Sequence, residues 1–167
     1  MTRAFVALGG NLDGPARQIR AAFAALALLP ASRLVRASSL YRTAPVGYLD
    51  QPDFINAVAE LDTALAPADL LQALLAVEAE FGRRRSFRNA PRILDLDLLW
   101  YQGVTQNDPD LILPHPRMHE RAFVLYPLAE LAPDLAIGTH GCAAELAARC
   151  PAAGIERLRD EDDEGSE

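Results

Sequence analysis

The stretch FINAVAEL, residues 54–61, decides the fold. Positions 55, 57, 59 and 61 are all apolar, whereas positions 54, 56, 58 and 60 include polar residues, so the pattern has a period of two. Successive side chains of a β-strand point to opposite faces, so Phe54 and Asn56 share one face and the small and branched residues between them share the other. This pattern predicts a strand with two distinct faces: one carries Phe54, Asn56, Val58 and Glu60, and the other carries Ile55, Ala57, Ala59 and Leu61.

Further strands and helices are expected on both sides of this stretch. Strands are expected at 3–8, 34–41 and 93–101, and helices at 15–29 and 67–81. Pro15 and Pro67 suit the first turn of a helix, and Gly82 suits a helix end. The order is β-α-β-β-α-β, which predicts an α+β fold: a ferredoxin-like sandwich with a mainly antiparallel sheet and helices packed on it. Extra C-terminal helices are expected, one after a loop within 114–129 and one at 141–149.

The chain of 167 residues is the right length for a single domain, which we expect at 1–159. Residues 160–167 hold six acids and no base, so they are expected to form a disordered acidic tail. This tail accounts for most of the net charge of −7, and the remaining body is close to neutral. We expect a cytoplasmic location, because residues 1–5 show no signal-peptide pattern and no run is apolar enough to span a membrane. We also expect a monomer.

All sixteen basic residues are arginines. The absence of lysine excludes a P-loop lysine, a Schiff-base lysine and a lysine general base. Cys142 and Cys150 match no zinc motif and form no disulfide framework. Any phosphate bound by this chain must therefore be held by arginine, histidine or backbone amides.

Two aspartates lie in the strand expected at 93–101. Asp95 and Asp97 alternate with leucines, so both carboxylates point to the same face, ~7 Å apart along the strand. Oxygen ligands favour Mg²⁺, which takes one or two carboxylates and completes its shell with water and phosphate oxygens. A merely solvated strand face is the alternative for this pair taken alone.

An arginine-rich segment directly precedes that strand, with members Arg83, Arg84, Arg85, Arg88 and Arg92. Guanidinium groups match phosphate oxygens in a bidentate manner and stabilise the charge on a transferring phosphoryl group. A solvated basic loop or a nucleic-acid patch would explain the arginines alone. Carboxylates beside five arginines are better explained by a polyphosphate with Mg²⁺ between them, so we expect phosphoryl-group chemistry.

Two further segments carry candidate binding residues. His115 lies between two prolines and near Arg121, where it could donate a hydrogen bond to a phosphate. Phe54 and Asn56 share a strand face, and an aromatic ring beside a carboxamide suits a flat heterocycle. An ordinary polar position on a sheet face explains Asn56 equally well.

The residues quoted so far also carry a family resemblance. Residues 7–12 (ALGGNL), 41–45 (YRTAP), 50–56 (DQPDFIN), 91–97 (PRILDLD) and 114–115 (PH) resemble the hydroxymethyl-dihydropterin pyrophosphokinases of folate biosynthesis. The likeness runs from about residue 2 to about residue 135, and PRxLDLD is its most specific segment. The resemblance implies transfer of the pyrophosphoryl group of ATP, the co-substrate, to the hydroxymethyl group of 6-hydroxymethyl-7,8-dihydropterin, which releases AMP.

The resemblance also implies residue roles. Asp95 and Asp97 would bind two Mg²⁺ ions, and Arg83 and Arg92 would bind phosphates and stabilise the transferring group. The remaining expected ATP-binding residues are Glu78, Arg85, His115 and Arg121. The expected pterin-binding residues are Thr43, Ala44, Val46, Phe54, Asn56 and Phe123, with the two phenylalanines on either side of the ring.

One departure from the family pattern concerns the arginine-rich segment. Many members carry Arg-Trp-Gly-Pro-Arg before the aspartate strand, whereas residues 88–92 read RNAPR here. Asn89 cannot replace the stacking of an indole, so the resemblance predicts a pterin site without this aromatic cover.

Three other functions fit parts of the pattern. An RNA-binding module would place aromatics in an RNP-type segment, which this chain lacks, and the near-neutral body argues against a surface that binds nucleic acid. A regulatory binding domain would not need two aspartates beside an arginine-rich segment. A nuclease with a D-x-D pair is the nearest enzyme alternative, and AMP formation from ATP distinguishes it.

Overall fold

A computed structural model describes residues 1–45, 49–82, 93–152 and 154–159. Six strands of this part of the chain form one sheet in the order β5-β1-β4-β3-β8, with β2 also paired to β4, and every ladder is antiparallel. The strands are β1 (Thr2–Gly10), β2 (Ser32–Ala37), β3 (Tyr41–Thr43), β4 (Phe54–Thr63), β5 (Asp95–Tyr101) and β8 (Ile155–Arg157). The expected α+β class and antiparallel sheet are confirmed.

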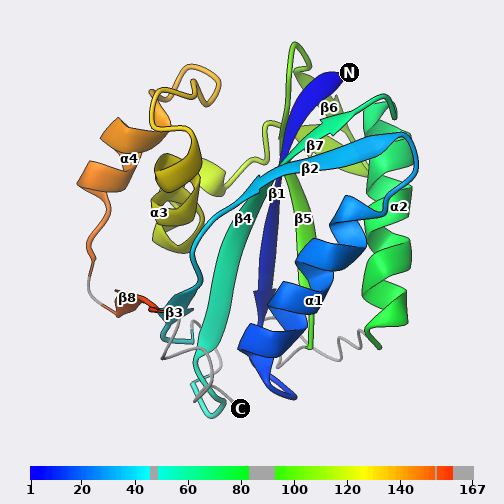
Figure 1. The fold of residues 1–167 in the computed structure, drawn as a ribbon. Helices are drawn as coiled ribbons and strands as arrows, with labels where there is room; N and C mark the ends of the chain where they lie inside the picture. The colour runs from blue at the N-terminus through cyan, green and yellow to red at the C-terminus, as the bar shows by residue number, and fades with distance from the viewer. Residues whose placement is uncertain (46–48, 83–92, 153, 160–167) are drawn as a thin grey trace.

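The helices cover the two faces of this sheet (Figure 1). One face packs against α1 (Pro15–Ala27) and α2 (Pro67–Glu80), and the other packs against α3 (Ala122–Leu131) and α4 (Ala143–Arg149). We call these the α1/α2 face and the α3/α4 face. A one-turn 3₁₀ helix, η1 (Met118–Glu120), precedes α3.

The period of two in the central strands divides their side chains between two cores. On β1, Val6 belongs to the α1/α2 core and Phe5 to the α3/α4 core, and both are fully buried. On β4, Ile55 lies in the first core and Val58 in the second. Each such buried side chain contributes about 1.5–3 kcal/mol relative to exposure. The alternation predicted for residues 54–61 is therefore confirmed.

The helix limits agree closely with the prediction. Pro15 and Pro67 are the first residues of α1 and α2. Gly82 has a φ of 74°, the left-handed conformation expected just after a helix. The segment expected to hold a loop and a helix, 114–129, contains η1 and most of α3 (Ala122–Leu131), and the helix expected at 141–149 is α4 (Ala143–Arg149).

The single strand expected at 34–41 is two strands in the structure, β2 and β3. Between them, the backbone N–H of Ser38 donates to the Val58 carbonyl (2.9 Å), and the Ser38 hydroxyl accepts from the Val58 N–H (2.9 Å). A serine side chain thus replaces a backbone partner, which interrupts the ladder.

Three short strands were not predicted from the sequence. A separate hairpin is formed by β6 (Gln106–Asp108) and β7 (Leu111–Leu113), and β8 pairs with β3 near the C-terminal end.

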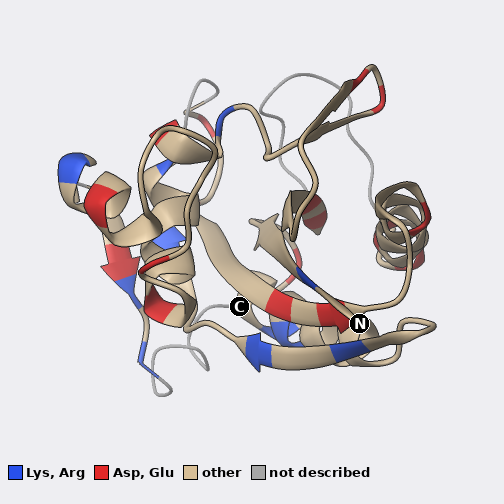
Figure 2. Ribbon diagram, turned by 90° about the horizontal axis from the view of Figure 1, so that it is seen from above, with Lys and Arg blue, Asp and Glu red and all other residues tan. Residues whose placement is uncertain are grey.

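Charged residues of opposite sign lie on neighbouring strands, as the blue and red segments of β2 and β4 show in Figure 2. Arg33 bonds to Asp62 at 2.8 Å, and Arg36 bonds to Glu60 at 2.9 Å. Arg3 reaches the same Glu60 carboxylate from β1 at 2.9 Å.

The helices of the described segments include none with the length and apolar character that a bilayer crossing requires.

Candidate active site

A cavity of about 590 Å³ opens on the α3/α4 face, at the end of the sheet where β1 ends and β4 and β5 begin. Its floor consists of sheet residues, its first wall is η1 and the start of α3, and its second wall comes from the C-terminal segment. The floor residues that matter below are Gly9, Thr43, Phe54, Asn56, Asp95 and Asp97. Gly9, Asn56 and Asp95, which are 39 or more positions apart in sequence, meet here because antiparallel strands bring their ends together.

The strand register sets the spacing of the floor residues. Gly9 on β1 pairs with Asn56 on one side and with Asp95 on the other. Neighbouring strands are ~4.8 Å apart, so Asn56 and Asp95 lie ~10 Å apart across Gly9. A carboxamide and a carboxylate thus face the same cavity across a glycine.

Gly9 leaves room that Asn56 needs. A Cβ atom at position 9 would lie 2.8 Å from Asn56 Oδ1, closer than real Cβ contacts allow. The Asn56 Nδ2 group donates to Thr43 Oγ1 at 2.7 Å, in a buried hydrogen bond. This bond directs Oδ1 toward Gly9, where it can accept a hydrogen bond from a ligand. The absence of a side chain at Gly9 is a feature that the sequence analysis did not identify as functional, although the residue lies in the quoted ALGGNL motif.

The carboxylates of Asp95 and Asp97 both line the cavity, as the alternation along the strand predicts. Their strand is held from outside the sheet by Glu78 of α2, whose Oε2 accepts the Leu96 N–H at 2.6 Å. Leu96 is the residue between the two aspartates, so this bond fixes the backbone that carries both carboxylates.

Glu78 itself does not line the cavity. It is 3% exposed and lies one helical turn after Leu74, on the face of α2 that packs against the sheet. The structure therefore gives Glu78 a role in holding β5, and its expected contact with the nucleotide stays a prediction.

Two aromatic rings line the cavity beyond Asn56. Phe54 comes from β4 and Phe123 from the first turn of α3. Ala44 also lines the cavity, but its N–H already donates to the Gly154 carbonyl at 3.1 Å. Ala44 was expected to offer its backbone groups to a ligand. Because this bond already engages the N–H, the carbonyl is the group that a ligand could contact.

A buried asparagine in the turn after β1 holds the segment that leads into β4. Asn11 is 2% exposed, and its Nδ2 donates to Gln51 Oε1 (2.8 Å) and to the Pro52 carbonyl (2.9 Å). Phe54 follows directly, so Asn11 fixes the approach to the cavity floor. The sequence motif contained Asn11, but nothing local to it revealed these partners.

The first wall of the cavity is polar: it contains Arg117, Glu120 and Arg121, all of which line the cavity. His115 lies nearby, and its backbone N–H donates to the Leu99 carbonyl of β5 at 2.7 Å. Burial and, to a smaller extent, the nearby charge of Arg121 lower the pKa of His115 to about 4, and the carboxylate of Asp95 opposes this shift. His115 is therefore neutral at pH 7.

The hydrogen bonds of His115 also fix its tautomer. Its Nδ1 accepts the Arg117 N–H at 3.2 Å, so the ring proton is on Nε2. Nε2–H is then a neutral donor. His115 is not among the residues that line the cavity, so its contact with a phosphate oxygen stays a prediction.

Several predicted site residues, Val46, Arg83, Arg85 and Arg92, lie outside the described residues, as do Asn89 and the acidic tail. Within the described residues, no group of three or more histidine, cysteine or acidic side chains could hold a metal ion. The two aspartates alone still fit Mg²⁺, because this ion commonly takes one or two carboxylates and fills its shell with water and phosphate oxygens.

Comparison with known proteins gives one consistent answer. Residues 5–133 match the family model for 7,8-dihydro-6-hydroxymethylpterin-pyrophosphokinase. A protein of Pseudomonas aeruginosa named 2-amino-4-hydroxy-6-hydroxymethyldihydropteridine pyrophosphokinase is 54% identical over 93% of this chain and 96% of its own length. A protein of the same name from Methylorubrum extorquens is 46% identical over 95% of this chain and 99% of its own length.

Solved structures support the fold. A crystal structure of the Plasmodium falciparum HPPK-DHPS superposes with a TM-score of 0.71 at 14% identity, and the match covers 89% of this chain. That match spans 43% of the solved chain, so the present chain corresponds to less than half of it. From the family model and the two bacterial relatives, we conclude that this chain belongs to the 7,8-dihydro-6-hydroxymethylpterin-pyrophosphokinase family.

Proposed function

We propose that this chain transfers the pyrophosphoryl group of ATP to 6-hydroxymethyl-7,8-dihydropterin, a step of folate biosynthesis. The observation that carries the proposal is the identity of 54% to a named pyrophosphokinase over nearly the full length of both chains. The hydroxymethyl oxygen would attack the β-phosphorus, and the bond from that phosphorus to the oxygen bridging to the α-phosphate would break. AMP leaves with that oxygen, and the hydroxyl proton is released.

The cavity offers a place for each substrate. The heterocycle would lie over β4, with Asn56 Oδ1 as an acceptor for a ring or amino N–H and with Phe54 and Phe123 against the ring faces. The hydroxymethyl group would then point toward Asp95 and Asp97, two strands away. This orientation brings the reacting oxygen to the acidic end of the cavity.

The triphosphate would occupy the polar side. Asp95 and Asp97 are the proposed ligands of Mg²⁺, two ions by family resemblance, and the metal would neutralise charge on the phosphates during transfer. Arg121, which lines the cavity, and the Nε2–H of His115, which lies near Arg121 and Asp95, are the proposed donors to the phosphate oxygens. The roles proposed for Arg83, Arg85 and Arg92 concern residues outside the described part of the chain.

The remaining assignments are consistent with this function. The strand order β5-β1-β4-β2 supports naming the core ferredoxin-like, with residues 1–159 as one domain. A cytoplasmic location and a monomeric state stay predictions.

The test is an assay of AMP formation. Purified protein is incubated with ATP, Mg²⁺ and hydroxymethyl-dihydropterin, and AMP is followed with and without the pterin. Asp97→Asn, which keeps the size of the side chain, is the matched control. We expect pterin-dependent AMP from the wild type alone, and its absence there would refute the proposed function.

A further inference from the structure

The second wall of the cavity is formed by residues 150–152 and 154–158, here called the C-terminal wall. Pro151, Gly154 and Ile155 line the cavity at the end farthest from the aspartates. The family model ends at residue 133, so the C-terminal wall lies beyond the matched region. The residue roles implied by the family resemblance likewise include no member of this wall.

Pairing with β3 aims one side chain of the wall into the cavity. Ile155 pairs directly with Thr43, and Thr43 pairs directly with Phe54 of β4. Directly opposed residues of an antiparallel ladder point to the same face, so Ile155 lies on the same side as Thr43 and Phe54. Glu156 points to the opposite face, where it bonds to Arg42 at 3.0 Å.

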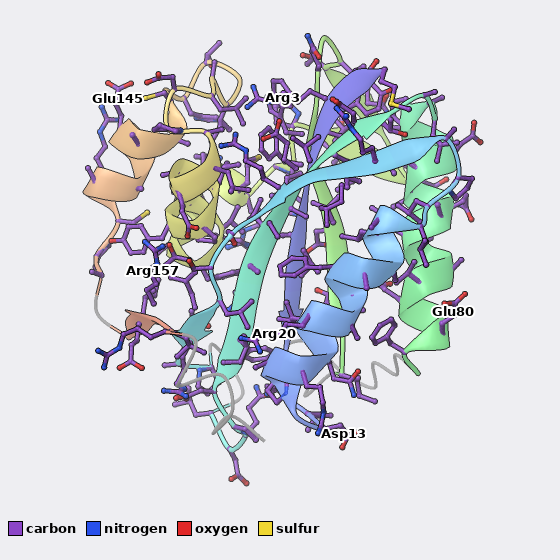
Figure 3. All side chains as sticks on the ribbon, in the orientation of Figure 1. Arg3, Asp13, Arg20, Glu80, Glu145 and Arg157 are labelled. Atoms are coloured by element: carbon purple, nitrogen blue, oxygen red, sulfur yellow. The ribbon has the colours of Figure 1, made fainter. Side chains whose placement is uncertain are left out.

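The C-terminal wall is anchored at both ends. Leu158 is 5% exposed, belongs to the α1/α2 core, and donates its N–H to the Leu40 carbonyl at 2.8 Å. Arg157, labelled in Figure 3, reaches toward α3 and bonds to Ser39 Oγ at 3.1 Å. At the other end, Tyr126 of α3 donates to the Cys150 carbonyl at 2.7 Å.

The position of Ile155 relative to the aspartates determines what it can contact. In the order β5-β1-β4-β3-β8, Ile155 lies four strands from Asp95, which corresponds to ~19 Å. If the hydroxymethyl group reacts beside the aspartates, as the proposed function requires, the pyrimidine end of the pterin points away from them. That end carries the 2-amino group and faces Thr43 and Ile155.

From this geometry we propose that Ile155 is a specificity-determining residue, whose side chain closes the cavity against the pyrimidine end of the pterin. The inference rests on the proposed function, because that function sets the orientation of the ring. Ile155 contacts the substrate edge and excludes pteridines with an added group on the 2-amino nitrogen.

The test compares Ile155→Ala with Glu156→Gln, the adjacent residue on the opposite face. Dissociation constants are measured for hydroxymethyl-dihydropterin, its N2-methyl derivative and ATP, together with melting temperatures. Ile155→Ala should weaken binding of the parent pterin about tenfold, equal to about 1.4 kcal/mol. It should also reduce the preference for the parent over the N2-methyl compound at least fivefold, and leave ATP affinity unchanged.

Glu156→Gln should alter none of these values. The proposal is overturned if the two variants behave alike, or if Ile155→Ala weakens both pterins by the same factor, which would indicate a purely structural role. If Ile155→Ala does not fold, Ile155→Val takes its place and should shift the same preference in the same direction, and an unchanged preference there is a refutation. Failure of the proposed function is separate, because it would appear as no pterin-dependent AMP from the wild type.

Discussion

Replacing Gly9 by alanine should weaken pterin binding, at a modest cost to the stability of the fold. The added Cβ would lie 2.8 Å from Asn56 Oδ1, whereas ordinary contacts begin near 3.4 Å. The backbone of Gly9 cannot easily move away, because it is paired with Asn56 on one side and Asp95 on the other. The Asn56 carboxamide must therefore shift by roughly half an ångström or rotate.

The magnitude follows from the hydrogen bond that such a shift disturbs. Asn56 Nδ2 donates to Thr43 Oγ1 in a buried bond of 2.7 Å, and leaving buried partners unpaired costs about 1–3 kcal/mol. Alanine in a strand is more favourable than glycine by about 0.5–1 kcal/mol, so the net loss of folding stability should be about 0–2.5 kcal/mol. The displaced acceptor should weaken pterin binding by about 10- to 100-fold, or about 1.4–2.8 kcal/mol.

A double-mutant cycle with Asn56→Ala isolates this effect. Pterin affinity is measured by calorimetry and stability by urea unfolding for the wild type, both single variants and the double variant. In the Asn56→Ala background, Gly9→Ala should cost little more, because the colliding oxygen is gone. Wild-type pterin affinity in the single Gly9→Ala variant, or equal effects of Gly9→Ala in both backgrounds, would refute the reasoning.

Three further predictions concern the acidic strand and its neighbours. Asp97→Asn should lower turnover by about 100-fold or more and remove the Mg²⁺ dependence of nucleotide binding, and near-normal turnover would exclude a metal role. Glu78→Ala should reduce the free energy of unfolding by about 1–3 kcal/mol, because the Leu96 N–H loses its buried acceptor. Glu78→Gln keeps an acceptor oxygen and should retain most of the wild-type stability. Equal losses of stability for the two variants in urea unfolding would contradict this. Because burial lowers the pKa of His115 from 6.5 to about 4, the unfolded chain binds more protons than the folded chain between these values, so stability falls as pH falls through this window. His115→Asn should therefore lose less stability than the wild type between pH 7 and pH 5, and identical losses would count against this shift.

Long alternating segments made much of the fold predictable from sequence. The period of two in residues 54–61 assigned Asn56 to the same face as Phe54, and both line the cavity. The same period placed Asp95 and Asp97 on one face of their strand, again toward the cavity. The sequence of each strand was sufficient for these assignments, because the face to which a side chain points depends on its position within its own strand.

Features that depend on partners distant in sequence were not predictable. The three residues of β8 have no pattern of their own and form a strand because β3 offers an edge. Glu78 resembles any polar residue on a helix, and its bond to Leu96 depends on how α2 lies against β5. Likewise, the collision that Gly9 avoids involves Asn56, 47 positions away along the chain.

The bonds that hold β5 have a consequence for self-association. Among the strands that the structure describes, β5 is the last at its end of the sheet, and such strands can pair with strands of other molecules and start aggregation. Here the Leu96 N–H is occupied by Glu78, and the Leu99 carbonyl by the His115 N–H. Many proteins protect exposed strands with lysine, which this chain does not contain. Variants that free the Leu96 N–H should therefore expose a surface on which further copies of the chain can assemble.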